Sequence, residues 1–189
     1  MGAIRRPTGG RAILHHREIT YSVAGPASGA GGLHESYRLI NRLLVDGLRA
    51  LGLPVAIAGS SPQAMIPGPV PCFDHPSAGE LVADGRKLVG SAQWRTERSL
   101  LQHGSILIDD DQPMLTRLLR EPAADPPPAA TLRALLGEPP SLSEVARAIF
   151  SAVERDDPAA SPLPLDGSLT ESSARLAKHY ADPAWTWRR

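Results

Sequence analysis

The sequence has one cysteine, no excess of either charge and no long apolar run, and each of these absences narrows what the protein can be. A lone cysteine in 189 residues cannot form a disulfide within the chain, which fits a reducing compartment. Lys plus Arg and Asp plus Glu both number 20, so a net charge of zero gives no reason to expect nucleic acid or an anionic membrane as a partner. No apolar stretch reaches the roughly 20 residues of a membrane-spanning helix, and residues 1–7 contain no apolar signal core. We therefore expect a cytoplasmic protein that binds neither nucleic acid nor membrane.

Several catalytic and metal-binding motifs are missing as well. The chain has no Gly-x-Ser-x-Gly elbow for a serine nucleophile and no phosphate-binding loop that ends in Gly-Lys-Ser/Thr. Its histidines lack the spacing of metal ligands, and Cys72 with His75 forms half of a zinc motif without a second half. The sequence therefore predicts no metal site.

The segments that are present are typical of a mixed α/β (α+β) fold. Apolar residues recur at three- and four-residue steps over 34–51, which predicts a helix that ends at Gly52. Asp84-Gly85 separates two apolar runs and predicts a hairpin within an antiparallel meander over 79–108. Strands are expected at 12–14, 19–23, 54–58, 93–95 and 105–108, a loop at 24–32 and a helix after the acidic run 109–111. Together they predict an antiparallel-rich sheet with helices packed against it.

The chain changes character after residue 120. A linker rich in Pro and Ala at 121–130 precedes a helix that Ser141 and Glu144 open as a capping box and that runs to about Arg155. A second proline-rich linker, at 157–164, leads to a last helix at about 170–180. We predict a main body over 1–120 and, over 121–189, a proline-linked helical extension of the same domain.

The candidate chemistry lies in three segments of the sequence. They are Arg5–His15 (RRPTGGRAILH), Pro71–Ser77 (PCFDHPS), and Gly85–Gln93 (GRKLVGSAQ) with the following Leu101–Ile106 (LQHGSI). Adjacent glycines let a ligand lie against the backbone and its amide donors. A thiol is only slightly ionised at neutral pH, so a nucleophilic cysteine needs a cationic neighbour. Alone, these features also fit a simple turn, a small buried thiol, a solvated lysine and ordinary sheet packing.

In this order and at these separations, the three segments resemble the biotin/lipoate protein ligase superfamily, and most closely its cysteine-dependent octanoyltransferase branch within the lipoate–protein ligase family. The resemblance covers Ile4 to about Asp110, together with the tail Tyr180–Arg189. It implies a fold like that of class II aminoacyl-tRNA synthetases and biotin synthetase, with residues 1–120 as the catalytic domain.

The resemblance also implies a role for each motif. Cys72 would be the nucleophile, and Lys87 would stabilise both its thiolate and the charge that develops on the acyl carbonyl oxygen. The residues expected to bind the acyl group are Arg6, Gly9, Gly10, His15, Gly90, Ser91 and Ala92. The octanoyl or lipoyl group would pass from acyl carrier protein through Cys72 to a lysine of the glycine-cleavage H protein or of lipoyl domains of 2-oxoacid dehydrogenases. No cofactor is expected, because the thioester is already activated.

The sequence departs from the family pattern at two places. His16 stands where the family usually has Asp. Relatives also carry several dozen residues before the Arg-Arg motif, so we expect the N-terminal part of the family domain to be missing here. Three explanations would account for such a missing segment: the start codon is misplaced, a separate chain supplies this part, or the gene is a degraded fragment.

Two alternative functions remain open at this point. An ATP-dependent lipoate–protein ligase would make an acyl-adenylate with ATP and Mg²⁺ and would not need a cysteine at position 72. A truncated, non-catalytic homologue would only bind the acyl group or a partner subunit.

Overall fold

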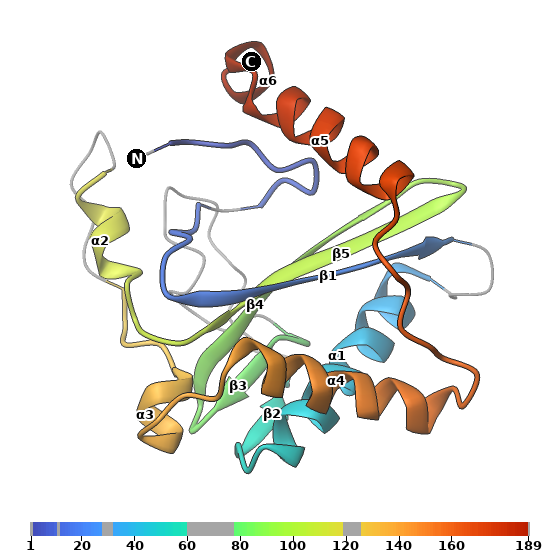
Figure 1. Ribbon diagram of the computed structural model, residues 1–189. Helices are drawn as coiled ribbons and strands as arrows, with labels where there is room; N and C mark the ends of the chain where they lie inside the picture. Colours follow the sequence, from blue (N-terminus) through green and yellow to red (C-terminus); the bar gives the residue numbers. More distant parts are fainter. Residues whose placement is uncertain (1, 11, 28–31, 60–77, 119–125, 189) are drawn as a thin grey trace.

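A five-stranded antiparallel sheet forms the centre of the protein, here a computed structural model that describes residues 2–10, 12–27, 32–59, 78–118 and 126–188 (Figure 1). The strands are β1 (Glu18–Pro26), β2 (Val55–Ile57), β3 (Leu81–Ala83), β4 (Arg86–Arg95) and β5 (Ser99–Leu107). Their order is β1-β5-β4-β3-β2, so β3, β4 and β5 form the predicted meander. Within the described residues, β1 and β2 are the two edges of the sheet.

Helices α1 (Leu33–Ala50), α3 (Leu132–Leu136) and α4 (Leu142–Asp156) cover one side of this sheet (Figure 1). Apolar side chains of α1 and of the strands form one buried core, which also contains Leu132 and Val145. Helix α4 lies directly on α1, because a Cβ added to Gly47 would come within 2.7 Å of the Cα of Ile149. Residues on both sides of position 120 thus share this core, and the division at 120 stays a prediction.

Two local predictions are confirmed by backbone conformation. Asp84 and Gly85 both have positive φ angles, 50° and 71°, as the two central residues of a type I′ hairpin turn require. Gly52, with φ 85°, follows the end of α1 in the left-handed conformation that glycine adopts most easily. The capping box of α4 is also present, with Ser141 and Glu144 bonded to each other's backbone amides.

Other predictions about elements are wrong or incomplete. Residues 12–14 do not form a strand, since the backbone of Leu14 bonds to a side chain rather than to a neighbouring strand. Strand β1 continues to Pro26 through part of the expected loop, because β5 pairs with it along its whole length. After the acidic run only the short helix α2 (Pro113–Thr116) forms. The short α3 and α6 (Pro183–Thr186) were not predicted.

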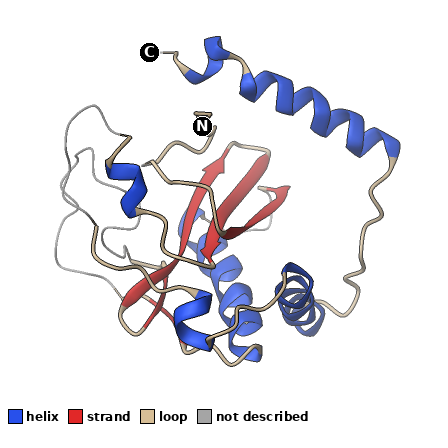
Figure 2. Cartoon of the chain, turned by 60° about the vertical axis from the view of Figure 1, so that its left-hand side comes forward, coloured by secondary structure: helices blue, strands red, loops and turns tan. Residues whose placement is uncertain are grey.

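The C-terminal helices lie on the other side of the sheet (Figure 2). Helix α5 (Gly167–Ala181) has no buried residue, and α6 follows it closely. The ring N–H of Trp185 donates a hydrogen bond of 2.7 Å to the carbonyl oxygen of Arg5, which ties α6 to the N-terminal segment. In the part of the chain that the structure describes, no helix has the length and apolar character needed to cross a bilayer.

Candidate active site

The sheet face that points away from α1 carries several of the residues that the sequence singled out. Side chains alternate between the two faces of a strand, so residues paired across neighbouring strands share a face. Ala92 of β4 pairs with His103 of β5, and Gly90 pairs with Ser105. Ile19, Val89 and Ile106 alternate with this set and belong to the core under α1, which identifies the opposite face as the one carrying Gly90, Ala92 and His103.

The glycine-bearing N-terminal segment lies against this face. The Thr8 hydroxyl and the Nε2 of His103 form a hydrogen bond of 2.7 Å, which fixes the segment over β5. Gly9 and Gly10 have φ angles of 65° and 89°, a conformation that other residues rarely adopt. A Cβ on Gly10 would lie 3.0 Å from the guanidinium of Arg6, so the turn holds this cation against the glycine backbone. The structure therefore brings Arg6, Gly9 and Gly10 together.

His15 is held near the same sheet face by the buried carboxylate of Glu18. Its Nδ1 lies 2.5 Å from Oε1 of Glu18, a residue of β1 that is turned toward the same sheet face. The hydrogen bond from His15 to Glu18 raises the pKa of this imidazole, against the opposing effects of burial and of the Arg6 cation. Burial by itself would raise the pKa of Glu18, but its hydrogen bonds with His15 and Ser105 lower it overall.

His103 differs from His15 in its electrostatic state. Burial lowers the pKa of His103, and the nearby cations Arg6 and His15 lower it further. The face therefore carries the guanidinium of Arg6, one imidazole whose pKa is raised and one whose pKa is lowered. Sequence reasoning named His103 only as part of a strand motif and did not notice Glu18.

A side-chain clamp holds the backbone that carries His15. The buried amide of Gln112 accepts a hydrogen bond of 3.1 Å from the N–H of Leu14 and donates one of 2.9 Å to its carbonyl oxygen. Three positions further on, Arg17 pairs with Asp111 and lowers the pKa of that carboxyl to about 2. Asp111 and Gln112, which follow β5, thus hold the two ends of residues 14–17.

Ser91 lies on the opposite side of the sheet from Gly90 and Ala92. Its hydroxyl is 2.6 Å from the Tyr21 hydroxyl, which accepts a hydrogen bond from Gln102, and Gln102 also donates to Asn41 of α1. This network lies between sheet and helix, where burial raises the pKa of Tyr37 to about 12. The side chain of Ser91 therefore faces α1, which alternation along β4 would have indicated.

Lys87 is almost fully buried, with 3% of its surface exposed, and its Nζ lies 2.7 Å from Oε1 of Glu80. A buried ammonium beside a carboxylate is a far more unusual group than a solvated lysine. Glu80 precedes β3 and faces Lys87 across the hairpin, a pairing that the sequence analysis missed. Cys72, the expected nucleophile, lies outside the described residues, so its distance from Lys87 stays a prediction.

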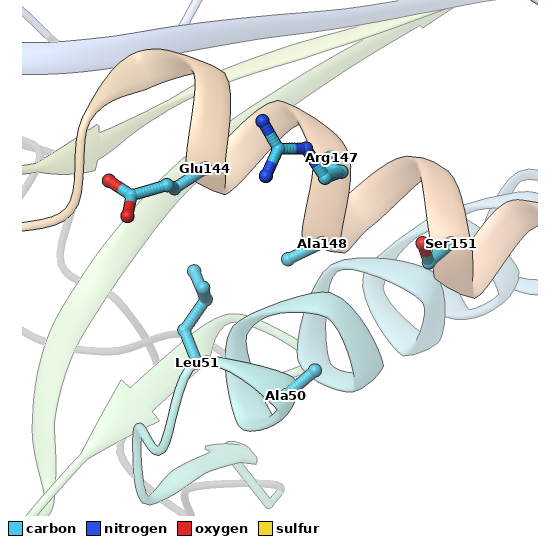
Figure 3. A pocket seen from close by; sticks show the side chains of 6 residues that line it. All are labelled: Ala50, Leu51, Glu144, Arg147, Ala148 and Ser151. Carbon is cyan, nitrogen blue, oxygen red and sulfur yellow. The ribbon is translucent and has the colours of Figure 1, made fainter.

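A hollow far along the chain from these motifs opens between the end of α1 and the start of α4 (Figure 3). It is lined by Ala50, Leu51, Glu144, Arg147, Ala148 and Ser151. Glu144 already serves the capping box, and the hollow contains none of the residues expected in the site. Within the described ranges, no three His, Cys, Asp or Glu residues gather closely enough to bind a metal ion.

Solved structures that resemble this architecture include lipoate and biotin protein ligases. A lipoate-protein ligase A bound with ATP superposes with a TM-score of 0.76 over 97% of this chain and 71% of that one, at 22% identity. A putative lipoate protein ligase from T. acidophilum superposes with a TM-score of 0.74 over 97% of this chain and 71% of that one, at 22% identity. A biotin protein ligase from Aquifex aeolicus superposes with a TM-score of 0.51 over 80% of this chain and 57% of that one, at 13% identity. These likenesses confirm the predicted fold class.

The sequence identifies the family within that class. The family model of the lipoyl protein ligase A/B catalytic domain matches residues 1–154, so the chain belongs to this family. It is 44% identical over 165 residues to octanoyltransferase LipM of Symbiobacterium thermophilum, which covers 80% of this chain and 60% of the relative. It is 38% identical over 205 residues to octanoyltransferase LipM of Kyrpidia tusciae, which covers 100% of this chain and 75% of the relative.

The chain corresponds to only part of several of these relatives. It spans 60% of the Symbiobacterium thermophilum protein and 47% of octanoyltransferase LipM of Geobacillus kaustophilus, to which it is 42% identical over 130 residues.

Proposed function

We propose that this protein is an octanoyl or lipoyl transferase that moves an acyl group from acyl carrier protein to a lysine of a lipoyl-accepting protein, by way of Cys72. The observation that carries the proposal is the 44% and 38% identity to proteins named octanoyltransferase LipM. Membership of the lipoyl protein ligase A/B family and the gathering of Arg6, Gly9, Gly10 and His15 on one sheet face support it.

The reaction proceeds in two acyl transfers. First, the Cys72 thiolate attacks the carbonyl carbon of the carrier thioester; a new C–S bond forms, the old one breaks, and the carrier leaves as a thiolate that takes up the proton released when Cys72 ionised. Second, the neutral acceptor amine attacks the Cys72 thioester; a C–N bond forms, the C–S bond breaks, and the Cys72 thiolate takes up the proton that the nitrogen loses. Both steps start from a thioester, so no resident cofactor is needed.

Lys87 would assist at the acyl carbonyl in both steps. A buried cation stabilises negative charge on a thiolate or on a developing oxyanion far better than a solvated one, because water no longer screens it. The carboxylate of Glu80, at 2.7 Å, offsets part of the cost of burying this ammonium and fixes its position.

The remaining residues would form the walls of the acyl site. Gly90 and Ala92 present little side chain on their sheet face, which would let an aliphatic chain lie close to the backbone of β4. Arg6 and His15 would line its polar end. Ser91 would contribute through its backbone, because its side chain is bonded to Tyr21 on the other side.

The test is mass spectrometry after incubation with octanoyl carrier protein. Because Cys72 is the only cysteine, a hydroxylamine-sensitive octanoyl adduct is expected on that residue and should then pass to an added lipoyl domain. Replacement of Cys72 by Ser should lower transfer at least about 10³-fold, since it removes the covalent nucleophile. Native protein that forms no adduct, or a Cys72→Ser variant with full activity, would contradict the proposal.

The ligase alternative is kept because of the structural likeness to lipoate-protein ligase A. Such an enzyme would make an acyl-adenylate from free lipoate, ATP and Mg²⁺ and would tolerate Cys72→Ser. Activity that requires ATP and survives this substitution would favour it.

The acceptor is proposed to be a lipoyl domain or the glycine-cleavage H protein. One structural neighbour is described as a bi-partite lipoate protein ligase with its E2 lipoyl domain from Thermoplasma acidophilum, at a TM-score of 0.72 and 21% identity. The cytoplasm stays the expected location on the sequence grounds given above.

A further inference from the structure

The position of the Lys87 ammonium depends on how Glu80 is held. Lys87 is 3% exposed, and its Nζ lies 2.7 Å from Oε1 of Glu80. A lysine side chain has many rotamers, so an ammonium that acts on one atom must be fixed by its neighbours. Glu80 itself stands one residue before β3, outside the regular part of the sheet. The contacts of residues 79 and 80 therefore determine where this carboxylate lies.

The backbone of Gly79 and Glu80 is held between β2 and α1. The N–H of Ala58, just after β2, donates a hydrogen bond of 2.8 Å to the carbonyl oxygen of Glu80. The N–H of Gly79 donates one of 2.9 Å to the carbonyl oxygen of Ala58. On the side of α1, a Cβ added to Gly79 would lie 3.2 Å from the ring of Tyr37, so the helix contacts this backbone directly.

One side chain of α1 bonds to the same backbone from the protein interior. Asn41 is fully buried, and its Nδ2 donates a hydrogen bond of 2.7 Å to the carbonyl oxygen of Gly79. Its Oδ1 accepts one of 3.0 Å from Nε2 of Gln102, a buried residue of β5. Because both ends of the amide are bonded, Asn41 cannot rotate without the loss of a buried hydrogen bond. The carbonyl group of Gly79 is thereby fixed relative to both helix and sheet.

Another buried polar residue of α1 shows what sets Asn41 apart. The hydroxyl of Ser36 donates to the carbonyl oxygens of Gly32 and Leu33, at the start of its own helix. Asn41 instead bonds to a residue 38 positions later in the chain. A buried amide costs free energy unless it is hydrogen-bonded, so packing alone would be served better by an apolar residue. The bond to Gly79 is therefore the specific contribution of this side chain.

We propose that Asn41 is a positioning residue for Lys87. It fixes Gly79, the following peptide bond fixes the backbone of Glu80, and the Glu80 carboxylate fixes the ammonium. Asn41 thus acts through Glu80 rather than on the substrate. This inference rests on the proposed function, because the position of Lys87 matters for transfer only if its ammonium acts at the acyl carbonyl.

Lysine labelling tests the position of the ammonium without reference to catalysis. The chain has two lysines, the buried Lys87 and the exposed Lys178 of α5, so the second is an internal reference. After brief treatment with the N-hydroxysuccinimide ester of acetate, mass spectrometry should find native Lys87 acetylated far more slowly than Lys178. Asn41→Leu keeps a similar volume but removes both hydrogen bonds. We expect it to raise the Lys87-to-Lys178 ratio about tenfold, because local opening around the ion pair becomes easier.

Val45→Ala is the matched control. Val45 is buried one turn further along α1 and belongs to the apolar core, so its truncation should also lower the melting temperature. It should change the labelling ratio much less than Asn41→Leu does. If Asn41→Leu does not fold, Asn41→Ala takes its place with the same expectation, because alanine adds no bulk and favours a helix.

Single-turnover octanoylation of Cys72 by octanoyl carrier protein is the second readout. Asn41→Leu should lower the rate at saturating carrier about tenfold or more, while the half-saturating carrier concentration stays within about twofold, because Lys87 would act at the acyl carbonyl and not on the carrier surface. Val45→Ala, assayed below its melting temperature, should keep both values close to native.

Each result decides for or against the inference. An equal rise of the labelling ratio in both variants would show that Asn41 only stabilises the fold, and would overturn it. Native octanoylation by an Asn41 variant whose Lys87 has become accessible would overturn it as well. If native protein forms no adduct on Cys72, the proposed function fails and the catalytic meaning of Asn41 fails with it. Labelling then still reports whether Asn41 holds the ammonium in place.

Discussion

At the scale of single residues, the buried Lys87 contacts a carboxylate that stands seven positions earlier in the sequence. Glu80 and Lys87 lie on opposite sides of a two-residue turn, and a register shift between Leu81 and Val82 brings their side chains together. Removing one member of a buried ion pair leaves a charge whose desolvation is no longer compensated. The proposed role of Lys87 in catalysis and its contribution to stability are therefore linked.

We expect Glu80→Gln to lower the free energy of unfolding by about 3 kcal/mol or more, since the buried ammonium loses its carboxylate. Urea denaturation of the native and variant proteins measures this. The control is Asp156→Asn, which removes the partner of the exposed Arg42 and should change stability little. Equal effects of the two substitutions would show that the Lys87–Glu80 pair behaves as an ordinary surface pair.

At the scale of elements, the side chain of Gln112 bonds to the backbone of Leu14 in the way that a neighbouring strand would. The residues around Leu14 have the composition of a strand. Its backbone N–H and C=O nevertheless bond to one buried side-chain amide that lies 98 residues away in the sequence. The clamp keeps the chain between the Gly9-Gly10 turn and β1 in a fixed path. It therefore determines where His15 stands relative to Glu18.

Gln112→Leu should loosen this path, because the N–H and C=O of Leu14 lose their partners at a cost of about 1–3 kcal/mol each. Hydrogen exchange at the Leu14 amide should become faster, and the KM for octanoyl carrier protein should rise more than kcat falls. Gln102→Leu is a matched control, because Gln102 is equally buried but bonds to Tyr21 and Asn41. It should destabilise the protein without speeding exchange at Leu14; equal exchange in both variants would argue against the clamp.

These elements also show which features could be foreseen from the sequence. Helices α1 and α4 and the hairpin at Asp84-Gly85 depend on periodicity, capping and turn residues within short stretches, so they were predicted correctly. The Leu14 segment and the Glu80–Lys87 pair depend on partners fixed only by the folded chain. Ser91 was grouped with Gly90 and Ala92 as a motif, although alternation along a strand turns its side chain to the other face.

At the scale of the whole molecule, the contact between α1 and α4 joins the sheet to the part of the chain after residue 120. The two helices approach so closely at Gly47 that its missing side chain makes room for the backbone of Ile149. Val145, one turn earlier in α4, completes the core beneath the sheet. Residues 142–156 therefore stabilise the sheet that carries the candidate site.

Gly47→Ala tests this contact. Alanine favours a helix over glycine by about 1 kcal/mol, but a Cβ at 2.7 Å from Ile149 Cα forces α4 to move, and overpacking costs about 1–3 kcal/mol. We expect a net loss of stability and a lower melting temperature. Gly167→Ala in α5, where an added Cβ would meet nothing within 4 Å, is the control and should be neutral or slightly stabilising. A neutral Gly47→Ala would mean that the two helices are not held this tightly.

The hydrogen bond between Trp185 and Arg5 has a practical consequence for solution work. The indole ring lies beside His179 and Tyr180, and Cζ of Arg188 lies 3.6 Å from the centre of the ring. We expect the fluorescence of Trp185 to depend on these neighbours. Because the carbonyl that it binds belongs to the residue just before Arg6, a displacement of the Gly9-Gly10 turn that moves Arg5 would change that environment. Trp185, one of three tryptophans in the chain, is therefore placed where its emission would respond to movement of the Gly9-Gly10 turn.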